Sequence, residues 1–341
     1  MENFMSSITI PSKNATRNAG VTIIDDSISD ADKNDSFEIM NDWRQAHEIP
    51  ARHIKIAMKN KASRMGFSRA IVASRLKRMH SIVGKLKRQR SMKLDRMQDI
   101  AGVRVILPTK EDVYKFHEAI TQARFRHELG TCKDYIENPK KDGYRGIHQV
   151  FKYQNHRFQQ YNGLNVEVQT RTYNQHIWAT AVEMIGLIEN RPFKTIDLTD
   201  DDEYKRFFVL SGEAFAAIDN GTVFEKAEEL RETIVNLNIL EKLRGAVTVK
   251  HIETSSARND YYHVVVLDMN KKTVSLQPFD RKQMREAMMM YQTVESVTKD
   301  INGVDILLLS AGHRDDIKKA YPNYFLDTAY FLSCMNRLCG L

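Results

Sequence analysis

The sequence is poor in cysteine, and its few cysteines are irregularly spaced. Cys132, Cys334 and Cys339 are the only three in 341 residues. So few thiols, at such spacings, fit neither a disulfide framework nor a zinc site. We therefore expect a protein of the reducing cytoplasm that holds no zinc.

Long apolar runs are also missing. No stretch reaches the about 18 consecutive apolar residues that a membrane-spanning helix needs, so we expect no membrane association. The first residues lack the basic region and apolar core that form a secretory signal. With 341 residues, the chain is long enough for two domains with sizeable cores.

Positive charge is present in excess, and it is concentrated in one segment. Residues 51–98 carry fifteen Lys and Arg against one acid, Asp95, which is a local charge of +14 in a chain of net charge +7. Such a segment either binds a polyanion or the phosphates of a nucleotide, or it is a solvated helix face. Composition alone leaves both interpretations open.

A second basic feature, residues 133–148 (KDYIENPKKDGYRGIH), is called the basic loop below. Its proline and two glycines disfavour a regular helix, so we expect a loop with cationic tips. Lys and Arg there can bind phosphates through charge-assisted hydrogen bonds, while Tyr144 offers a flat face on which a base can stack. A solvated basic turn is the alternative.

The N-terminal third predicts mostly helices. Residues 1–36 are polar and are interpreted as a loosely ordered arm. A helix is expected from Asp42 to Arg64. The apolar residues between positions 71 and 86 recur at three- and four-residue steps, which predicts an amphipathic helix. On that helix Lys77, Ser81 and Lys85 would share one face, where they line up along a polyphosphate or form a solvated stripe.

The middle of the chain alternates between strands and helices. Strands are expected at 101–107, 149–153 and 164–172, with a helix at 111–123. The last of these strands alternates so that Glu167, Gln169 and Arg171 share one face. Thr172 followed by Gln175 predicts a capping box that begins the next helix. This order of elements predicts an α+β or α/β domain with a mixed sheet.

The remaining sequence predicts a second unit. Two helices are expected between 202 and 245, with a break at Asn220-Gly221. Three antiparallel strands (247–252, 261–267, 273–276), a helix (282–297), a strand (304–310), a short helix (315–320) and an aromatic tail from Tyr321 follow. We therefore divide the chain into an arm (1–36), a first domain (37–200), connecting helices (201–244) and a small α/β domain (245–341).

Two carboxylates indicate the chemistry. Asp99 lies just before one predicted strand, and Glu167 lies on the face of another. Mg²⁺ prefers such hard oxygen ligands together with phosphate oxygens. Phosphoryl-type transfer is therefore the expected reaction class.

At these positions the sequence resembles the RelA/SpoT synthetase domain of alarmone synthetases, over about residues 40–190. The matching segments are Arg75-Leu76-Lys77 with Ser81-Ile82 and Lys85-Leu86, then Asp99 to Val105, then the basic loop, and finally Glu167-Val168-Gln169 with Arg171-Thr172, His176, Trp178 and Glu183. The resemblance implies an α+β, nucleotidyltransferase-like domain, with a mixed sheet flanked by helices.

The resemblance also implies an activity, an ATP-dependent pyrophosphate transfer. The β,γ-pyrophosphate of ATP would pass to a ribose 3′-hydroxyl and release AMP. Asp99 and Glu167 would hold Mg²⁺, and Glu167 would help to deprotonate the acceptor. The ATP side would comprise Arg75, Lys77, Ser81, Lys85 and Arg104. The acceptor side would comprise Lys133, Lys140, Lys141, Tyr144, Arg145, His148, Gln169, Arg171 and His176, with Tyr144 stacked on the base.

Three positions depart from the pattern of the alarmone synthetases. Asp142, Gly146 and Thr170 stand where an Asn, a Ser and an apolar residue are usual. These departures leave the reaction intact but put the identity of the acceptor in doubt. The His-Asp dipeptide of the family's hydrolase domain is missing from the sequence, so we expect no removal of the transferred group.

The C-terminal half resembles, by overall layout and its aromatic tail, the extra domain of fused toxin and antitoxin versions such as CapRel-like phage-defence proteins. That resemblance implies the tRNA 3′ end as acceptor, arrest of translation, and a C-terminal domain that restrains the enzyme until a phage protein binds. The alternative is a synthetase that makes guanosine or adenosine 3′-pyrophosphates. An inactive RNA-binding relative is a third reading, against which Asp99, Tyr144, Glu167 and Arg171 argue.

Overall fold

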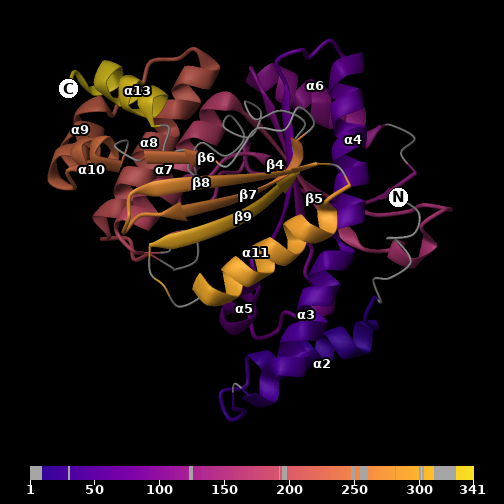
Figure 1. The fold of residues 1–341 in the computed structure, drawn as a ribbon. Coiled ribbons are helices and arrows are strands. Elements are labelled where there is room, and N and C mark those ends of the chain that lie inside the picture. Colours follow the sequence, from indigo (N-terminus) through magenta and orange to yellow (C-terminus); the bar gives the residue numbers. More distant parts are fainter. Residues whose placement is uncertain are drawn as a thin grey trace.

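The structure is a computed structural model (Figure 1). It describes residues 10–29, 31–122, 126–191, 193, 198–246, 250–253, 260–280, 282–298, 301, 303–310 and 328–341. The predicted short helix at 315–320 and the aromatic stretch 321–327 lie outside these residues. In the part of the chain that is described, no helix combines the length and the apolar character needed to cross a bilayer.

One mixed sheet organises the described residues. Its nine strands lie in the order β3-β4-β5-β2-β1-β9-β7-β8-β6. The strands are β1 (Ile71–Leu76), β2 (Ala101–Leu107), β3 (Glu128–Asp134), β4 (Ile147–Lys152), β5 (Asn165–Thr172), β6 (Lys250–Glu253), β7 (Asp260–Asp268), β8 (Thr273–Asp280) and β9 (Val304–Ser310). The expected α+β class with a mixed sheet is confirmed.

The helices cover both faces of this sheet (Figure 1). They are α2 (Lys13–Ile23), α3 (Asn34–Ala46), α4 (Glu48–Arg64), α5 (Met79–Arg88), α6 (Lys110–Thr121), α7 (Tyr173–Ile188), α8 (Glu203–Asn220), α9 (Ala227–Asn236), α10 (Ile239–Ala246), α11 (Met284–Thr298) and α13 (Ala329–Cys339). Residues of α4, α6 and α11 share one core cluster with the sheet. Those of α7, α8, α9, α10 and α13 share a second cluster with it, and residues of α2, α3 and α5 share a third.

The middle of the sheet follows the predicted alternation. Strand β5 lies parallel to β2 and antiparallel to β4, with Glu167 opposite Gly102 and Gln169 opposite both Arg104 and His148. Val166 and Val168 are fully buried, so Glu167, Gln169 and Arg171 fall on the opposite face. The capping box of Thr172 and Gln175 at the start of α7 is confirmed.

The C-terminal strands continue the same sheet. Strand β9 pairs with β1 through Ser74 opposite Ser310 and Arg75 opposite Leu309, and β7 pairs with β9 along its length. The expectation of three antiparallel strands was wrong in one respect, because β6 runs parallel to β8. The C-terminal segment is therefore joined to the first half by backbone hydrogen bonds.

Several predicted helices differ from the structure. The expected helix over 71–86 is strand β1 followed by α5, because the chain from Ile71 to Leu76 pairs with β2 and β9. The arm contains α2, which buries Ala19 and Ile23. The helix expected from Asp42 is the end of α3 followed by α4. The connecting segment holds α8, α9 and α10, three helices rather than two.

Candidate active site

The basic loop links two strands and has a defined shape. Its first two residues end β3 and its last two begin β4, so the strand β3 was missed in the sequence. The backbone N–H of Tyr135 donates to Gly146 at 2.9 Å, and that of Lys140 donates to Tyr144 at 3.1 Å. The Asp142 carboxylate accepts from the backbone N–H of Tyr144 at 3.0 Å. These bonds fix the position of the residue predicted to stack on a base.

The Tyr144 ring lies among cations. The Lys140 ammonium is 4.9 Å and the Arg171 guanidinium 5.8 Å from the ring centroid. Burial raises the pKa of Tyr144, although Arg171 and Arg104 oppose the shift. Because the Lys140 side chain is exposed, a base can displace it from the ring at little cost.

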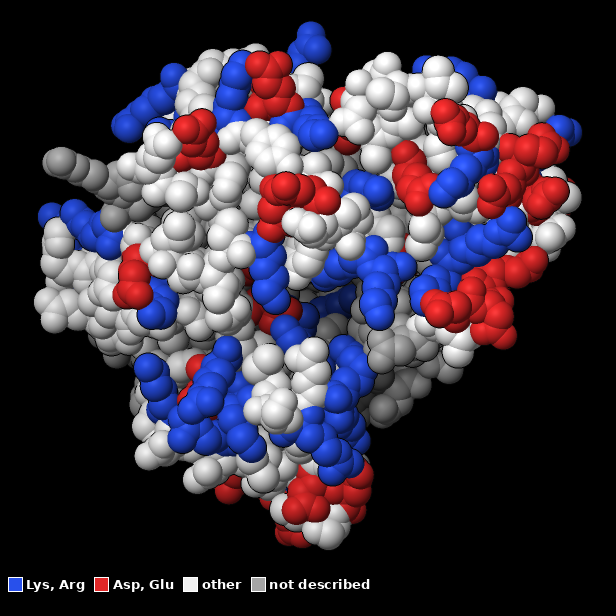
Figure 2. All heavy atoms as spheres, turned by 180° about the vertical axis from the view of Figure 1, so that it is seen from behind, with Lys and Arg blue, Asp and Glu red and all other residues white. Residues whose placement is uncertain are grey.

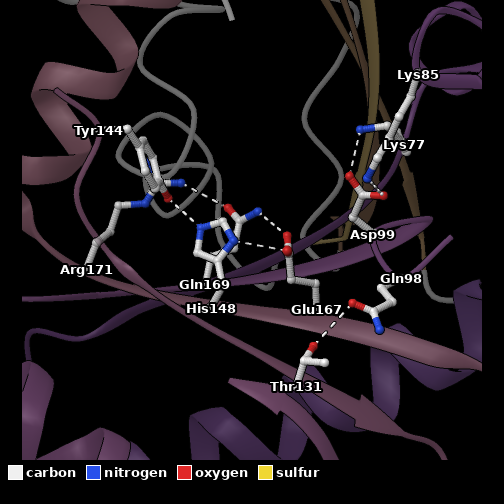
Figure 3. A network of polar contacts seen from close by, with 10 residues as sticks. All are labelled: Lys77, Lys85, Gln98, Asp99, Thr131, Tyr144, His148, Glu167, Gln169 and Arg171. Carbon is white, nitrogen blue, oxygen red and sulfur yellow. Dashed lines mark hydrogen bonds and ion pairs between the residues drawn. The ribbon is translucent and has the colours of Figure 1, made fainter. Parts of the chain in front are cut away.

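From Tyr144 a chain of hydrogen bonds runs along β4 and β5 (Figure 3). The Tyr144 hydroxyl and His148 Nε2 are 2.7 Å apart, and His148 Nδ1 lies 3.0 Å from Glu167 Oε1. Gln169 Nε2 donates to Glu167 Oε2 at 2.5 Å, and Arg171 donates to Gln169 Oε1 at 3.1 Å. Both oxygens of Glu167 are therefore held in place.

The environment of Glu167 keeps it charged. Burial pushes its pKa upward, but the hydrogen bond and charge of His148 and the hydrogen bond from Gln169 outweigh burial, so the pKa is lowered. The Glu167 side chain is 15% exposed, so a ligand can still reach it. A carboxylate that is ionised, oriented and reachable can accept a proton or bind a cation.

Asp99 forms a second cluster beside the first. Lys77 Nζ lies 2.9 Å from Asp99 Oδ2, and Lys85 Nζ lies 2.8 Å from Oδ1. Burial pushes the pKa of Asp99 upward, but the two ammonium groups lower it to about 2. Burial also lowers the pKa of Lys77. The helix predicted over 71–86 was wrong, but Lys77 and Lys85 do lie together at Asp99. Lys77 follows the last residue of β1, and α5, which carries Lys85, begins two residues later.

The low pKa of Asp99 predicts a loss of stability in acid. Its pKa of about 2 in the folded chain lies below the roughly 3.9 expected for an unfolded Asp. A group whose pKa is depressed on folding stabilises the fold above the unfolded pKa, and this contribution is lost as the pH falls from about 4 to about 2. Urea unfolding of the wild type and Asp99→Asn should therefore differ at pH 6 and converge near pH 2. A gap that is independent of pH would contradict the ion pairs.

The two clusters face one another. The charge of Asp99 acts on Glu167 and opposes the lowering of its pKa, and Figure 3 shows both carboxylates directed into the same space. Figure 2 shows Lys and Arg side chains gathered around a hollow on this side of the molecule. Within the described residues no group of three or more His, Cys, Asp or Glu could hold a metal.

The donor set fits Mg²⁺ in the company of a nucleotide. Two neighbouring carboxylates, Asp99 and Glu167, are ionised at neutral pH, and their side chains are 21% and 15% exposed. Mg²⁺ commonly binds one or two carboxylates together with phosphate oxygens and water. The nearby Lys77 and Lys85 suit the phosphates that would complete such a site.

The other predicted site residues are spread around these clusters. Arg75 lies in β1, where its charge lowers the pKa of Lys77, and Ser81 is half-buried on α5. Arg104 is buried in β2, while Lys133 and Lys141 are exposed. His176 has no exposed surface, so it can influence an acceptor only through its neighbours.

Arg145 bonds to the basic loop itself. Its guanidinium donates to the carbonyl of Gly143 at 3.1 Å, and burial lowers its pKa. Arg145 therefore shapes the loop in this structure.

Two acidic residues of the C-terminal half reach the start of α5 and were missed in the sequence. Glu295 Oε1 accepts from the backbone N–H of Met79 at 2.9 Å, and Asp305 forms an ion pair with Arg78. Asp305 is the one charged residue of strand β9 and precedes four apolar residues, which is a signal that could have identified it. Both contacts lie next to Lys77.

The part of the chain that carries this site is similar to known proteins. Residues 74–185 match a family model described as "Region found in RelA / SpoT proteins". The chain contains a region similar to RelA/SpoT proteins. Every predicted site residue from Arg75 to His176 falls inside it, whereas α8 to α13 and β6 to β9 fall outside.

The curated relatives described here are all named as GTP pyrophosphokinases or GTP diphosphokinases. GTP pyrophosphokinase YwaC of Bacillus subtilis is 34% identical over 116 residues, which are 31% of this chain and 53% of that protein. GTP pyrophosphokinase YjbM of the same species is 32% identical over 111 residues, with 32% and 52% covered. Probable GTP diphosphokinase RSH3 of Oryza sativa subsp. japonica is 33% identical over 120 residues, with 33% and 15% covered. The chain spans about half, or less, of these relatives.

A solved structure is also similar. The crystal structure of small alarmone synthetase 1 from Bacillus subtilis bound to its product pppGpp has a TM-score of 0.44 at 24% identity, and it covers 52% of this chain and 90% of that one.

Proposed function

We propose that this protein is an ATP-dependent pyrophosphokinase that transfers the β,γ-pyrophosphate of ATP to the 3′-hydroxyl of a guanosine nucleotide. The observation that supports this most is the pairing of the Lys77, Asp99 and Lys85 cluster with the Tyr144, His148 and Glu167 chain across one space. The names of the curated relatives favour a guanosine acceptor.

On the ATP side, the two lysines bind the phosphates. Lys77 and Lys85 each pair with Asp99 in this structure, and a triphosphate carries more negative charge than one carboxylate. Binding of ATP therefore draws the ammonium groups away from Asp99, and its oxygens become available. Asp99 and Glu167 would then hold Mg²⁺, which would offset negative charge on the phosphates.

On the acceptor side, Tyr144 stacks on the base and Arg171 approaches the phosphates. Glu167 takes the proton of the 3′-hydroxyl while the 3′-oxygen attacks the β-phosphorus of ATP. A bond forms between the 3′-oxygen and the β-phosphorus, the bond from that phosphorus to the oxygen that bridges it to the α-phosphorus breaks, and AMP leaves with that oxygen. His148 and Gln169 orient Glu167 for this step.

The test is transfer of label from ATP carrying a radioactive γ-phosphate. Purified protein with Mg²⁺ is incubated separately with GDP, GTP, ATP alone and deacylated tRNA. Label on GDP or GTP, with AMP released in equal amount, is the expected result. Label on none of the four acceptors would contradict pyrophosphate transfer.

A second candidate acceptor is the 3′ end of tRNA. The observation that favours it is a group of exposed cations that follow Lys85 in and just after α5; these are Lys87, Arg88, Arg90 and Arg96. Figure 2 shows Lys and Arg gathered on this face below the hollow. A free nucleotide does not reach so many cations, whereas an RNA backbone can contact all of them.

A double substitution separates the two acceptors. Arg88→Gln with Arg90→Gln should lower labelling of tRNA by about tenfold at moderate salt and reduce the salt slope of its binding by about two, since each cation releases counterions. Labelling of GDP should stay unchanged, and Lys271→Gln with Lys272→Gln, at the exposed β7 to β8 turn, is the control. Equal losses for GDP and tRNA would contradict an RNA-binding role.

We further propose that the C-terminal half restrains the site and that a partner, such as a phage protein, relieves the restraint. Support comes from the carboxylates of Glu295 and Asp305, which hold the start of α5 beside Lys77. Pairing of β9 with Arg75 adds a backbone contact on the ATP side. In that arrangement the protein would act as a fused toxin and antitoxin, and the tRNA acceptor would be its target.

A further inference from the structure

Helix α8 lies outside the region similar to RelA/SpoT proteins and touches the basic loop through backbone atoms. A Cβ atom built on Gly143 would lie 2.7 Å from the Phe208 carbonyl oxygen, and one built on Gly212 would lie 2.8 Å from the Gly143 carbonyl oxygen. Such distances leave no room for a side chain at either position. The loop and the helix are therefore in direct contact where both have glycine.

Each glycine is needed for a different reason. Gly143 has φ of 88°, a backbone conformation that favours glycine. Gly212 lies in the interior of α8, where glycine is less favourable than alanine. The close approach of Gly143 accounts for a glycine at this helical position.

The same helix is fixed to the strand that carries Glu167. At its C-terminal end, Asp219 accepts from the Thr172 hydroxyl at 2.7 Å and from the Asn174 amide at 2.8 Å. Closer to the loop, Trp178 Nε1 donates to the Phe208 carbonyl at 3.1 Å and to Ser211 Oγ at 3.0 Å. Helix α8 is thus held by the end of β5 and by α7 while it supports the loop.

Trp178 also contacts the residue that is proposed to stack on the acceptor. The Tyr144 and Trp178 ring centroids are 6.4 Å apart. A shift of α8 would therefore move the loop backbone at Gly143 and the ring beside Tyr144 together. Since the Tyr144 hydroxyl bonds to His148, the shift would reach the chain that orients Glu167.

We infer that α8 is a positioning element of the acceptor site: the contact of Gly212 with Gly143 holds the basic loop so that Tyr144 is ready to stack on the acceptor base. Gly212 touches no substrate and acts only through the loop. This inference rests on the proposed function for the role of Tyr144. It predicts that disturbing α8 weakens acceptor binding and spares ATP binding, because Lys77 and Lys85 lie on other elements.

The test compares two glycines with matched surroundings. Gly212→Ala places a methyl group against the loop carbonyl, whereas Gly186→Ala, in α7, places one 2.8 Å from the Arg191 carbonyl and away from the loop. Both full-length variants are measured for amide hydrogen exchange of residues 135–146, for the KM of each substrate and for kcat. Ser211→Ala, which removes one acceptor of the Trp178 indole, is a milder second variant.

The expected result is selective. Gly212→Ala should speed exchange in residues 135–146 and raise the acceptor KM by about tenfold, with the KM for ATP within about twofold of wild type. Ser211→Ala should raise the acceptor KM less, and Gly186→Ala should change neither quantity.

Other outcomes would overturn the inference. The first is amide exchange in residues 135–146 that stays at the wild-type rate in both Gly212→Ala and Ser211→Ala. The second is that Gly212→Ala and Gly186→Ala change exchange and the acceptor KM equally. The third is that Gly212→Ala raises the KM for ATP as much as the KM for the acceptor. If wild-type protein transfers pyrophosphate to no acceptor, the proposed function fails separately. Loop exchange then decides alone whether α8 positions the loop.

Discussion

Replacement of Glu167 by Gln should reduce pyrophosphate transfer by about a thousandfold, within the range for loss of a general base. The amide keeps the size of the side chain but cannot take the proton of the 3′-hydroxyl. It also carries no charge to bind a cation. Transfer of labelled pyrophosphate from ATP, measured at saturating concentrations of both substrates, gives this loss as a fall in kcat.

The neighbours of Glu167 supply the controls. Gln169→Leu and His148→Asn leave the carboxylate in place but remove or weaken one bond to it each, so we expect smaller losses, on the order of tenfold. Circular dichroism and thermal unfolding should show that Glu167→Gln is folded. Full activity in Glu167→Gln would contradict both the guanosine and the tRNA versions of the proposed reaction.

Two of the strands that carry the site, β2 and β5, were predictable from the sequence because their signals are local. Val103 and Val105 alternate with Arg104 in β2, and the same period places Glu167, Gln169 and Arg171 on one face of β5. The turn residues of the basic loop and the capping box at Thr172 depend on spacings of a few residues. Local backbone preferences decide such features.

The errors arose where distant pairing decides the structure. Residues 71–86 have apolar spacing that suits a helix, but Ile71 to Leu76 form a strand because β2 and β9 lie on either side. Strand β9 comes more than two hundred residues later in the chain, so no local pattern reveals the contact. The same holds for the contact of Gly212 with Gly143, which joins segments that sequence spacing does not relate.

The hydrogen bonds within the site depend on both local sequence and distant pairing. Tyr144 and Glu167 were predicted as site residues from their types and positions, and His148 from the resemblance to the synthetase domain. That the Tyr144 hydroxyl bonds to His148, and His148 to Glu167, depends on the register of β4 against β5. Residue types therefore indicate the chemistry, while strand register decides which groups orient which.

The substitution Glu295→Gln should lower the free energy of unfolding by about 3 kcal/mol, the range for breaking a buried ion pair. Its partner, Arg44, has no exposed surface, and the two side chains are 2.9 Å apart. The buried guanidinium would keep its charge, and Tyr291 and Asn41 would remain as its partners among the residues that the structure describes. Urea unfolding measures the loss, and Glu286→Gln, at an exposed position on the same helix, should be neutral.

The same variant tests whether the C-terminal half restrains the site. Glu295 also accepts from the backbone N–H of Met79 at the start of α5, and a neutral amide oxygen holds that N–H less strongly. If the contact restrains the ATP side, Glu295→Gln should raise kcat at temperatures where the protein is still folded, although it lowers stability. A fall in kcat that parallels the loss of folded protein would mean that the C-terminal half only supports the site. The double variant Arg44→Met with Glu295→Leu removes both buried charges and should recover the free energy of unfolding. It still lacks the bond from Glu295 to the Met79 N–H, so any change in kcat that remains comes from the loss of that bond and not from lower stability.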